Sequence, residues 1–296
     1  MAYSKTLMLL VAGGCLALTA HAETAGSSAD DSGQRVNLSG KLRMLSQRIP
    51  AAACFQAAGV AEGEATALLS GAAEEFAAIL GGLEEGDDAL GIYAPEVDRR
   101  VLMNIADLNA AWEPIQPDLA SLMEGDVTRG RVEGVVRAEA GLLDIAKRLV
   151  SEIVGEHADP YALTQASALA IDIAGRQRML AQRMSKSACM ITEDLEYDRA
   201  MGELAGAREI YHNSLMALRN GLPEVGIIDP PTPEIEAKLD EVIALWEAFQ
   251  PLLDIAVAGE ATDDQRADIM RTANALTGTM NQAVELYTAA ALQDRI

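Results

Sequence analysis

The chain has 296 residues, enough for two domains of ordinary size, and half of them are hydrophobic, so a sizeable core can form. Aromatic residues make up only 4%, and β-branched runs bounded by turn residues are scarce, which favours an all-α fold. The 45 acidic and 23 basic residues give a formal charge of −22, which disfavours nucleic acid as a partner and nonspecific contact with anionic membrane.

Residues 1–22 have the pattern of a secretory signal peptide. Lys5 gives the positive N-terminal region, an apolar stretch follows over residues 6–20, and Ala20-His21-Ala22 has the small-x-small form of a cleavage site. The stretch is short for a membrane span, which needs about 20 apolar residues. We therefore expect cleavage before Glu23 and a soluble periplasmic protein.

A lipid-anchored protein is the alternative, because Gly13-Gly14-Cys15 has part of a lipobox pattern. Cleavage fits better, since Ala12 stands where leucine is usual in a lipobox and more apolar residues follow the cysteine. Beyond residue 22 we expect no segment long and apolar enough to cross a membrane. The mature chain would then have no cytoplasmic part and would not carry a signal inward by itself.

Apolar residues at helical spacing predict two tandem four-helix modules, over residues 23–158 and 159–296. Pro50 lies near the middle of the first helix of the first module, so we expect a kink there. The four helices of the first module are expected at roughly 34–58, 62–84, 96–123 and 129–156.

The first helix carries an island of positive charge in this acidic chain. Lys41, Arg43 and Arg48 lie in a stretch from Val36 to Phe55 that has no acidic residue. Arg48 is about 140° around the helix from Arg43, because each residue turns the helix by 100°. The same geometry places five residues along one stripe, namely Gly40, Arg43, Gln47, Ala51 and Cys54.

The helices of the second module are expected at roughly 161–192, 195–219, 234–257 and 263–292. Asp159 is suited to cap the first of them, with Pro160 at its first position. Thr262 and Gln265 form a capping box for the last. The proline-rich stretch over residues 229–233 predicts a non-helical loop.

The second module repeats the first. The segment Val36–Ile49 recurs as Ile171–Met184, with its glycine, methionine, leucine and glutamine and two of its arginines identical. Trp112 recurs as Trp246, and this duplicated position indicates that each tryptophan fills a core. Internal duplication explains the match. The stripe of the second module is Gly175, Arg178, Gln182, Lys186 and Cys189.

If the modules pack about a pseudo-twofold axis parallel to their first helices, Arg43 faces Arg178. Two buried guanidinium groups repel each other, and an anion between them removes the repulsion. Guanidinium geometry suits planar oxyanions, which it binds through paired hydrogen bonds. The alternative is that the arginines form surface salt bridges with this acidic chain. The candidate ligand-binding residues are Gly40, Arg43, Gln47, Arg48, Gly175, Arg178, Gln182 and Arg183.

Two of these candidates have a second interpretation. Arg48 and Arg183 each lie five residues after the stripe arginine of their module, on another side of the helix. In that position they are also suited to hold the bundle together by pairing with Asp or Glu.

The same packing brings Cys54 towards Cys189. An oxidising, exported setting permits a disulfide, provided that the two Cα atoms lie within about 7 Å. The other interpretation is a pair of small buried thiols at equivalent helix positions. The sequence leaves both open.

The two motifs resemble the N-terminal sensor motif of PilJ-type and NarX-like domains. They read Gly40-Lys41-Leu42-Arg43-Met44-Leu45-Ser46-Gln47-Arg48 and Gly175-Arg176-Gln177-Arg178-Met179-Leu180-Ala181-Gln182-Arg183. Such domains are periplasmic four-helix modules of nitrate/nitrite sensor kinases and of type IV pilus chemotaxis transducers. The resemblance implies anion binding by Arg43 and Arg178, with Gly40 and Gly175 beside them, and a tandem chain would supply both halves of a site that the sensors form by dimerisation.

The resemblance also implies partners. The sensors have transmembrane and cytoplasmic parts that we do not expect here, so a membrane receptor or sensor kinase is the expected partner, and a homo-oligomer is compatible with the pattern. The rival hypothesis is a helical module that docks such a receptor, or a pilus or chemotaxis system, without any small ligand.

An enzyme is not expected, since no nucleophile triad, phosphate loop or dinucleotide-binding glycine pattern is present. Glu209 and His212 have the spacing of half a di-iron motif, but the second half is missing, and an ordinary helix face explains the pair better. The twelve methionines permit a copper hypothesis, although core packing accounts for them better. We therefore predict no metal and no cofactor.

Overall fold

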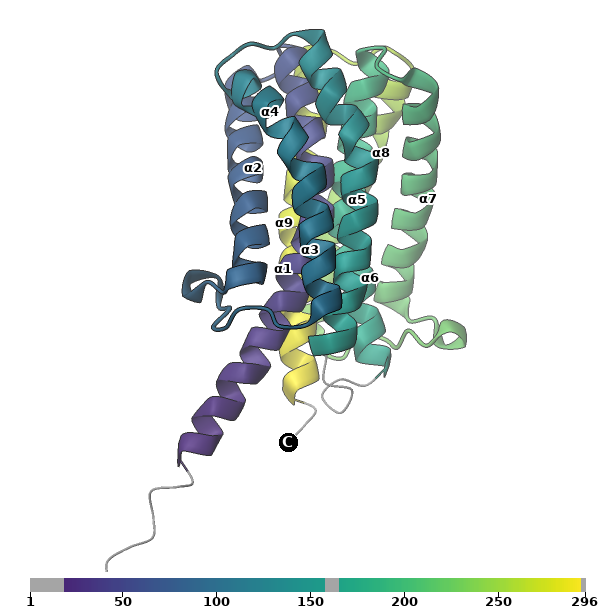
Figure 1. Ribbon diagram of the computed structural model, residues 1–296. Coiled ribbons are helices and arrows are strands. Elements are labelled where there is room, and N and C mark those ends of the chain that lie inside the picture. Colours follow the sequence, from purple (N-terminus) through teal and green to yellow (C-terminus); the bar gives the residue numbers. More distant parts are fainter. Residues whose placement is uncertain (1–18, 158–164, 294–296) are drawn as a thin grey trace, which may run out of the picture.

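The computed structural model describes residues 19–157 and 165–293, and within these ranges the chain is all-α, as predicted (Figure 1). Apart from helices, the described residues form only two isolated antiparallel bridges, Asp87 with Ile92 and Leu222 with Ile227. Most of the predicted signal peptide and the predicted cap formed by Asp159 and Pro160 lie outside the described residues.

Long helices and one broken helix build the first module. They are α1 (Thr19–Ala57), α2 (Glu62–Glu85), α3 (Arg99–Trp112), α4 (Gln116–Met123) and α5 (Arg129–His157), with short 3-10 turns at Asp88–Leu90 (η1) and Glu113–Ile115 (η2). The second module contains α6 (Gln165–Thr192), α7 (Tyr197–Asn220), η3 (Pro223–Val225), α8 (Pro233–Val257) and α9 (Asp263–Gln293).

Two expected boundaries were wrong in the first module. Helix α1 begins at Thr19 rather than near residue 34, because no proline ends the helix in between, and its start projects from the bundle (Figure 1). The helix expected over 96–123 is broken into α3 and α4. Pro114 provides the physical reason, since it lacks an N–H to continue the ladder. Its counterpart in the repeat is Ala248, and there α8 runs unbroken.

Other local predictions agree with the structure. The N–H of Thr262 donates to Gln265 Oε1 at 2.9 Å and the N–H of Gln265 donates to Thr262 Oγ1 at 3.3 Å, so the capping box is confirmed. The loop expected up to residue 233 ends slightly earlier, since Pro233 is the first residue of α8, a position where proline needs no N–H. Helix α1 continues through Pro50, and the kink expected there stays a prediction.

The first helix of each module lies at the centre of the molecule. Helix α1 packs against α2, α5 and α6, and α6 packs against α1, α7 and α9 (Figure 1). Both tryptophans are buried, as predicted: Trp112 stacks on Phe76 with ring centroids 4.3 Å apart, and Trp246 lies 4.8 Å from Tyr211. The central position of α1 and α6 brings the two motif helices into direct contact.

One helix among the described residues, α2, is long and apolar enough to cross a membrane by length and composition. This corrects the expectation that no later segment would qualify. Its apolar side chains, such as Leu69, Phe76 and Leu83, are buried in the protein core, while Glu74 on the same helix is exposed. The apolar content of α2 is therefore what the core of this bundle requires.

Candidate functional site

The contact between α1 and α6 places the two arginine stripes face to face. A Cβ atom at Gly40 would lie 3.3 Å from Arg178 Nη2 and 3.7 Å from Arg43 Nη2. A Cβ atom at Gly175 would lie 3.7 Å from the Nη2 atoms of both arginines. The two guanidinium groups therefore meet beside both glycines, and glycine at these positions leaves room for them.

Arg178 is buried without a carboxylate partner. The residue is only 2% exposed, so its guanidinium group is shielded from solvent. No carboxylate of the described residues lies within 4.0 Å of it. It donates to neutral oxygens instead: Asn37 Oδ1 at 3.2 Å, Asn281 Oδ1 at 2.5 Å and the carbonyl of Gly175 at 3.5 Å. Burial, and then the charge of Arg43, lower the pKa of Arg178 to about 10.

The positive charge of Arg43 is only slightly better compensated than that of Arg178. It is 8% exposed, and its Nη1 lies 3.4 Å from Asp172 Oδ1, while its Nε is buried without a hydrogen-bond partner. Arg176 competes for the same carboxylate, since its Nη2 lies 2.5 Å from Asp172 Oδ2. Burial lowers the pKa of Arg43, and the attraction of Asp172 opposes this shift.

The two stripe glutamines donate away from the arginine pair. Gln47 donates to Glu139 of α5, and Gln182 donates to Thr277 Oγ1 at 2.8 Å and Asn274 Oδ1 at 3.0 Å, both in α9. Their amide groups therefore fasten each motif helix to the last helix of its own module.

The two further arginines of the motif, Arg48 and Arg183, each have a carboxylate neighbour. Arg183 Nε lies 3.9 Å from Glu203 Oε2. Burial lowers the pKa of Arg48, and Glu75 opposes the shift. Of the eight candidates, the structure thus brings four together: Gly40, Arg43, Gly175 and Arg178.

A buried ion-pair network surrounds Lys186, which follows Gln182 in the stripe of the second module. Lys186 and Glu139 are fully buried, with Lys186 Nζ 2.7 Å from Glu139 Oε2 and 2.8 Å from Glu203 Oε2. Arg199 lies 3.3 Å from Glu139 and 2.8 Å from Glu203. Sequence analysis missed the two glutamates, although Glu139 could have been found as a charge on the apolar face of α5.

The stripes are covalently joined at one end. Cys54 and Cys189 form a disulfide, with their Cα atoms 6.2 Å apart. The bond connects α1 to α6 three helical turns beyond the arginines, because 11 residues separate Arg43 from Cys54. Of the two arrangements that the sequence allowed, the structure has the disulfide, and it holds the two motif helices in register.

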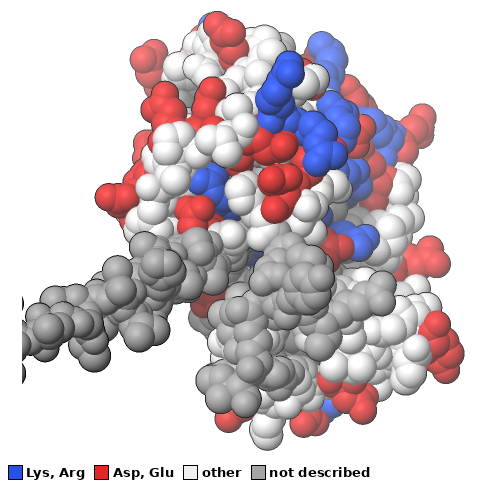
Figure 2. All heavy atoms as spheres, turned by 60° about the horizontal axis from the view of Figure 1, so that its bottom comes forward, with Lys and Arg blue, Asp and Glu red and all other residues white. Residues whose placement is uncertain are grey.

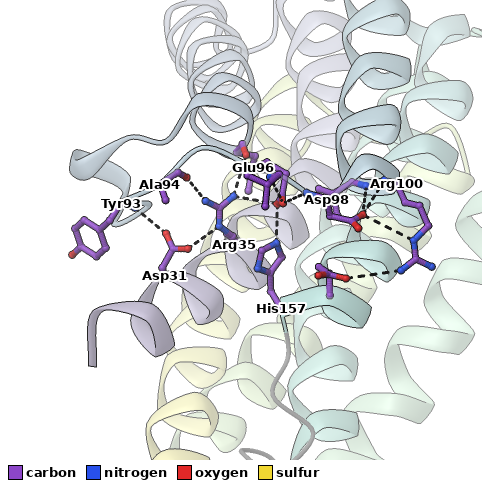
Figure 3. Close-up of polar contacts among 12 residues, drawn as sticks. Asp31, Arg35, Tyr93, Ala94, Glu96, Asp98, Arg100 and His157 are labelled. Carbon is purple, nitrogen blue, oxygen red and sulfur yellow. Dashed lines mark hydrogen bonds and ion pairs between the residues drawn. The ribbon is translucent and has the colours of Figure 1, made fainter. Parts of the chain in front are cut away.

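A third buried arginine, Arg35, was not among the candidates expected from the sequence, and it connects α1 to the loop between α2 and α3 (Figure 3). Arg35 pairs with Asp31 at 2.8 Å and with Glu96 at 3.3 Å, and it donates to the carbonyl of Ala94. His157 Nε2, at the end of α5, lies 2.7 Å from Glu96 Oε2. The cluster is specific to the first module, since Ala170 replaces Arg35 in the repeat.

Glu96→Gln is expected to destabilise the protein by about 1–3 kcal/mol at pH 7 and by much less at pH 3.5. Burial opposes the ionisation of Glu96, but hydrogen bonds from the N–H of Asp98, from His157 and from the N–H of Val97 outweigh it and lower its pKa. A lowered carboxyl pKa stabilises the fold above the pKa of the unfolded state, and this contribution is lost as the pH falls through the folded value.

Urea unfolding at both pH values measures this difference, with exposed Glu124→Gln as the control. An equal loss of stability at pH 7 and pH 3.5 would show that the charge of Glu96 contributes nothing.

The described surface carries charges of both signs. On the end of the molecule shown in Figure 2, basic and acidic side chains are interspersed. Many of the pairs are exposed, such as Arg271 with Glu64 at 2.6 Å, and exposed pairs of this kind contribute little to stability. Arg43 and Arg178 differ from them in being buried.

The family model described as "Type IV pili methyl-accepting chemotaxis transducer N-term", PilJ, matches the chain twice, over residues 25–134 and 162–272. No curated protein matches the chain. The two matches cover most of the chain, and each contains one arginine motif.

Proposed function

We propose that this chain, which belongs to the PilJ family of type IV pilus chemotaxis transducer N-terminal domains, is a periplasmic sensor-type protein that binds a small oxyanion such as nitrate or nitrite at its two buried motif arginines. Modules of this family are sensory rather than catalytic, and they work with membrane chemotaxis and pilus components. The proposed ligands of the anion are Arg43 and Arg178, and the chain would pass its ligand state to a membrane receptor.

One observation carries this proposal: Arg178 is buried against a second buried arginine and has only neutral partners. A buried cation without a counter-ion is costly, and a like charge beside it increases the cost. A bound anion would supply the missing charge to both groups. Paired N–H donors of guanidinium match the geometry of a planar oxyanion, which favours nitrate-like ligands.

We expect the purified protein to bind nitrate or nitrite in isothermal titration calorimetry, and Arg178→Gln to weaken that binding about tenfold to a hundredfold. The factor corresponds to the loss of one or two charge-assisted hydrogen bonds. Arg43→Gln should weaken it similarly. Arg148→Gln is the control, because Arg148 is exposed and lies 3.9 Å from Asp107 on the surface of the first module.

Thermal unfolding of the same variants separates loss of the site from loss of the fold. Removing an uncompensated buried charge relieves its desolvation cost, so ligand-free Arg178→Gln should melt no lower than ligand-free wild type. A folded wild-type protein that gives no heat with nitrate, nitrite or sulfate would contradict the proposal. That result would favour the rival function, a helical module that docks a receptor without a small ligand.

A further inference from the structure

The two arginines receive different partners from the opposite module. Asn37 and Asp172 occupy equivalent positions in the repeated motif, in Val36-Asn37-Leu38 and Ile171-Asp172-Ile173. Arg178 donates across the interface to Asn37 Oδ1 at 3.2 Å, and Arg43 donates across it to Asp172 Oδ1 at 3.4 Å. The two contacts obey the pseudo-twofold relation, but only one of them involves a carboxylate.

This exchange of one carboxylate for an amide determines the charge of the site. Two aspartates would give each guanidinium its own counter-ion, whereas the single Asp172 is shared between Arg43 and Arg176. The other partners of Arg178, Asn281 and the carbonyl of Gly175, are neutral.

The remaining charged side chains nearby are already engaged. Lys41 pairs with Glu75 at 3.1 Å, so these two cancel each other. Glu285 accepts from Asn281 Nδ2 at 2.7 Å, but it is exposed, and water screens its charge. Arg176 is exposed as well, so water screens its charge and Asp172 compensates the buried Arg43. One positive charge of the arginine pair, that of Arg178, therefore stays uncompensated in the protein interior.

We propose that Asn37 and Asp172 together set the charge selectivity of the arginine site, so that it takes a monovalent oxyanion and rejects a divalent one. This inference rests on the proposed function. A monovalent anion compensates the one free charge, and the unpartnered Nε of buried Arg43 offers it a donor. A divalent anion would leave a net negative charge beside Asp172 in a buried site, which is a costly arrangement.

Calorimetry with sodium nitrate and sodium sulfate, at constant ionic strength, tests this selectivity in the full chain. Wild type should bind nitrate at least tenfold more tightly than sulfate. Asn37→Asp should weaken nitrate binding at least tenfold, because the new carboxylate takes the place of the anion. Asp172→Asn should raise the affinity for sulfate relative to nitrate at least tenfold, because it frees a second positive charge.

Both substitutions are nearly isosteric, and a matched control is Asn213→Asp, which adds the same charge at an exposed position on α7. A second readout needs no ligand. Asn37→Asp should raise the Tm of the ligand-free protein by about 2–4 °C, the shift expected when a buried charge gains a counter-ion in a protein of this size.

The outcomes separate the two proposals. If folded wild type binds neither salt, the proposed function itself fails. If wild type binds nitrate but Asn37→Asp binds it equally well, the proposed function is supported, but the inference that Asn37 and Asp172 set the charge selectivity of the site is wrong. The same conclusion follows if wild type binds sulfate as tightly as nitrate.

Discussion

Replacing Cys54 and Cys189 by alanine is expected to lower the free energy of unfolding by about 4–5 kcal/mol. The two cysteines are separated by 135 residues, and closing so long a loop removes much conformational entropy from the unfolded chain. Alanine is the suitable replacement because both residues are buried and a serine hydroxyl would need a hydrogen-bond partner there. Urea unfolding of the oxidised wild type and of the double variant gives the difference.

Reduced wild type is the matched control for this experiment, since it lacks the bond but keeps both side chains. It should unfold close to the double variant and well below the oxidised protein. A double variant that unfolds at the same urea concentration as oxidised wild type would show that the disulfide does not stabilise the contact between the modules.

Lys186→Met is expected to lower the free energy of unfolding by about 3–5 kcal/mol, because it leaves the buried charge of Glu139 only partly compensated by positive charge. Lys186 and Glu139 are both fully buried and 2.7 Å apart, while Arg199, at 3.3 Å from Glu139, is partly exposed and also serves Glu203. Removing one partner of such a pair costs more than removing both, because the survivor keeps its desolvation penalty.

The repeat itself suggests the compensating variant. The positions equivalent to Lys186 and Glu139 are Ala51 and Ala273, so the same helix contact accepts apolar side chains in the other half of the molecule. We therefore expect the double variant Lys186→Met with Glu139→Leu to recover more than half of the stability lost in Lys186→Met. Urea unfolding of the single and double variants tests this, and a double variant less stable than the single one would contradict it.

The sequence by itself determined the helical modules, their duplication and the position of the arginine pair. These features depend on local spacing: apolar residues every three or four positions define a helix face, and Thr262 with Gln265 defines a helix start. Because Arg43 and Arg178 occupy equivalent places in the two copies, the approximate symmetry of the duplication sufficed to predict that they face each other.

The tertiary structure alone decided which partners the buried charges receive. Glu139 belongs to α5 and Glu203 to α7, and nothing in the local sequence of α6 indicates that both reach Lys186. The same holds for Arg35 and Glu96, and for the choice between a disulfide and two thiols at Cys54 and Cys189. Helical periodicity fixes the direction in which a side chain leaves its own helix. The packing of whole helices then sets the few ångströms that separate an ion pair or a disulfide from two unconnected groups.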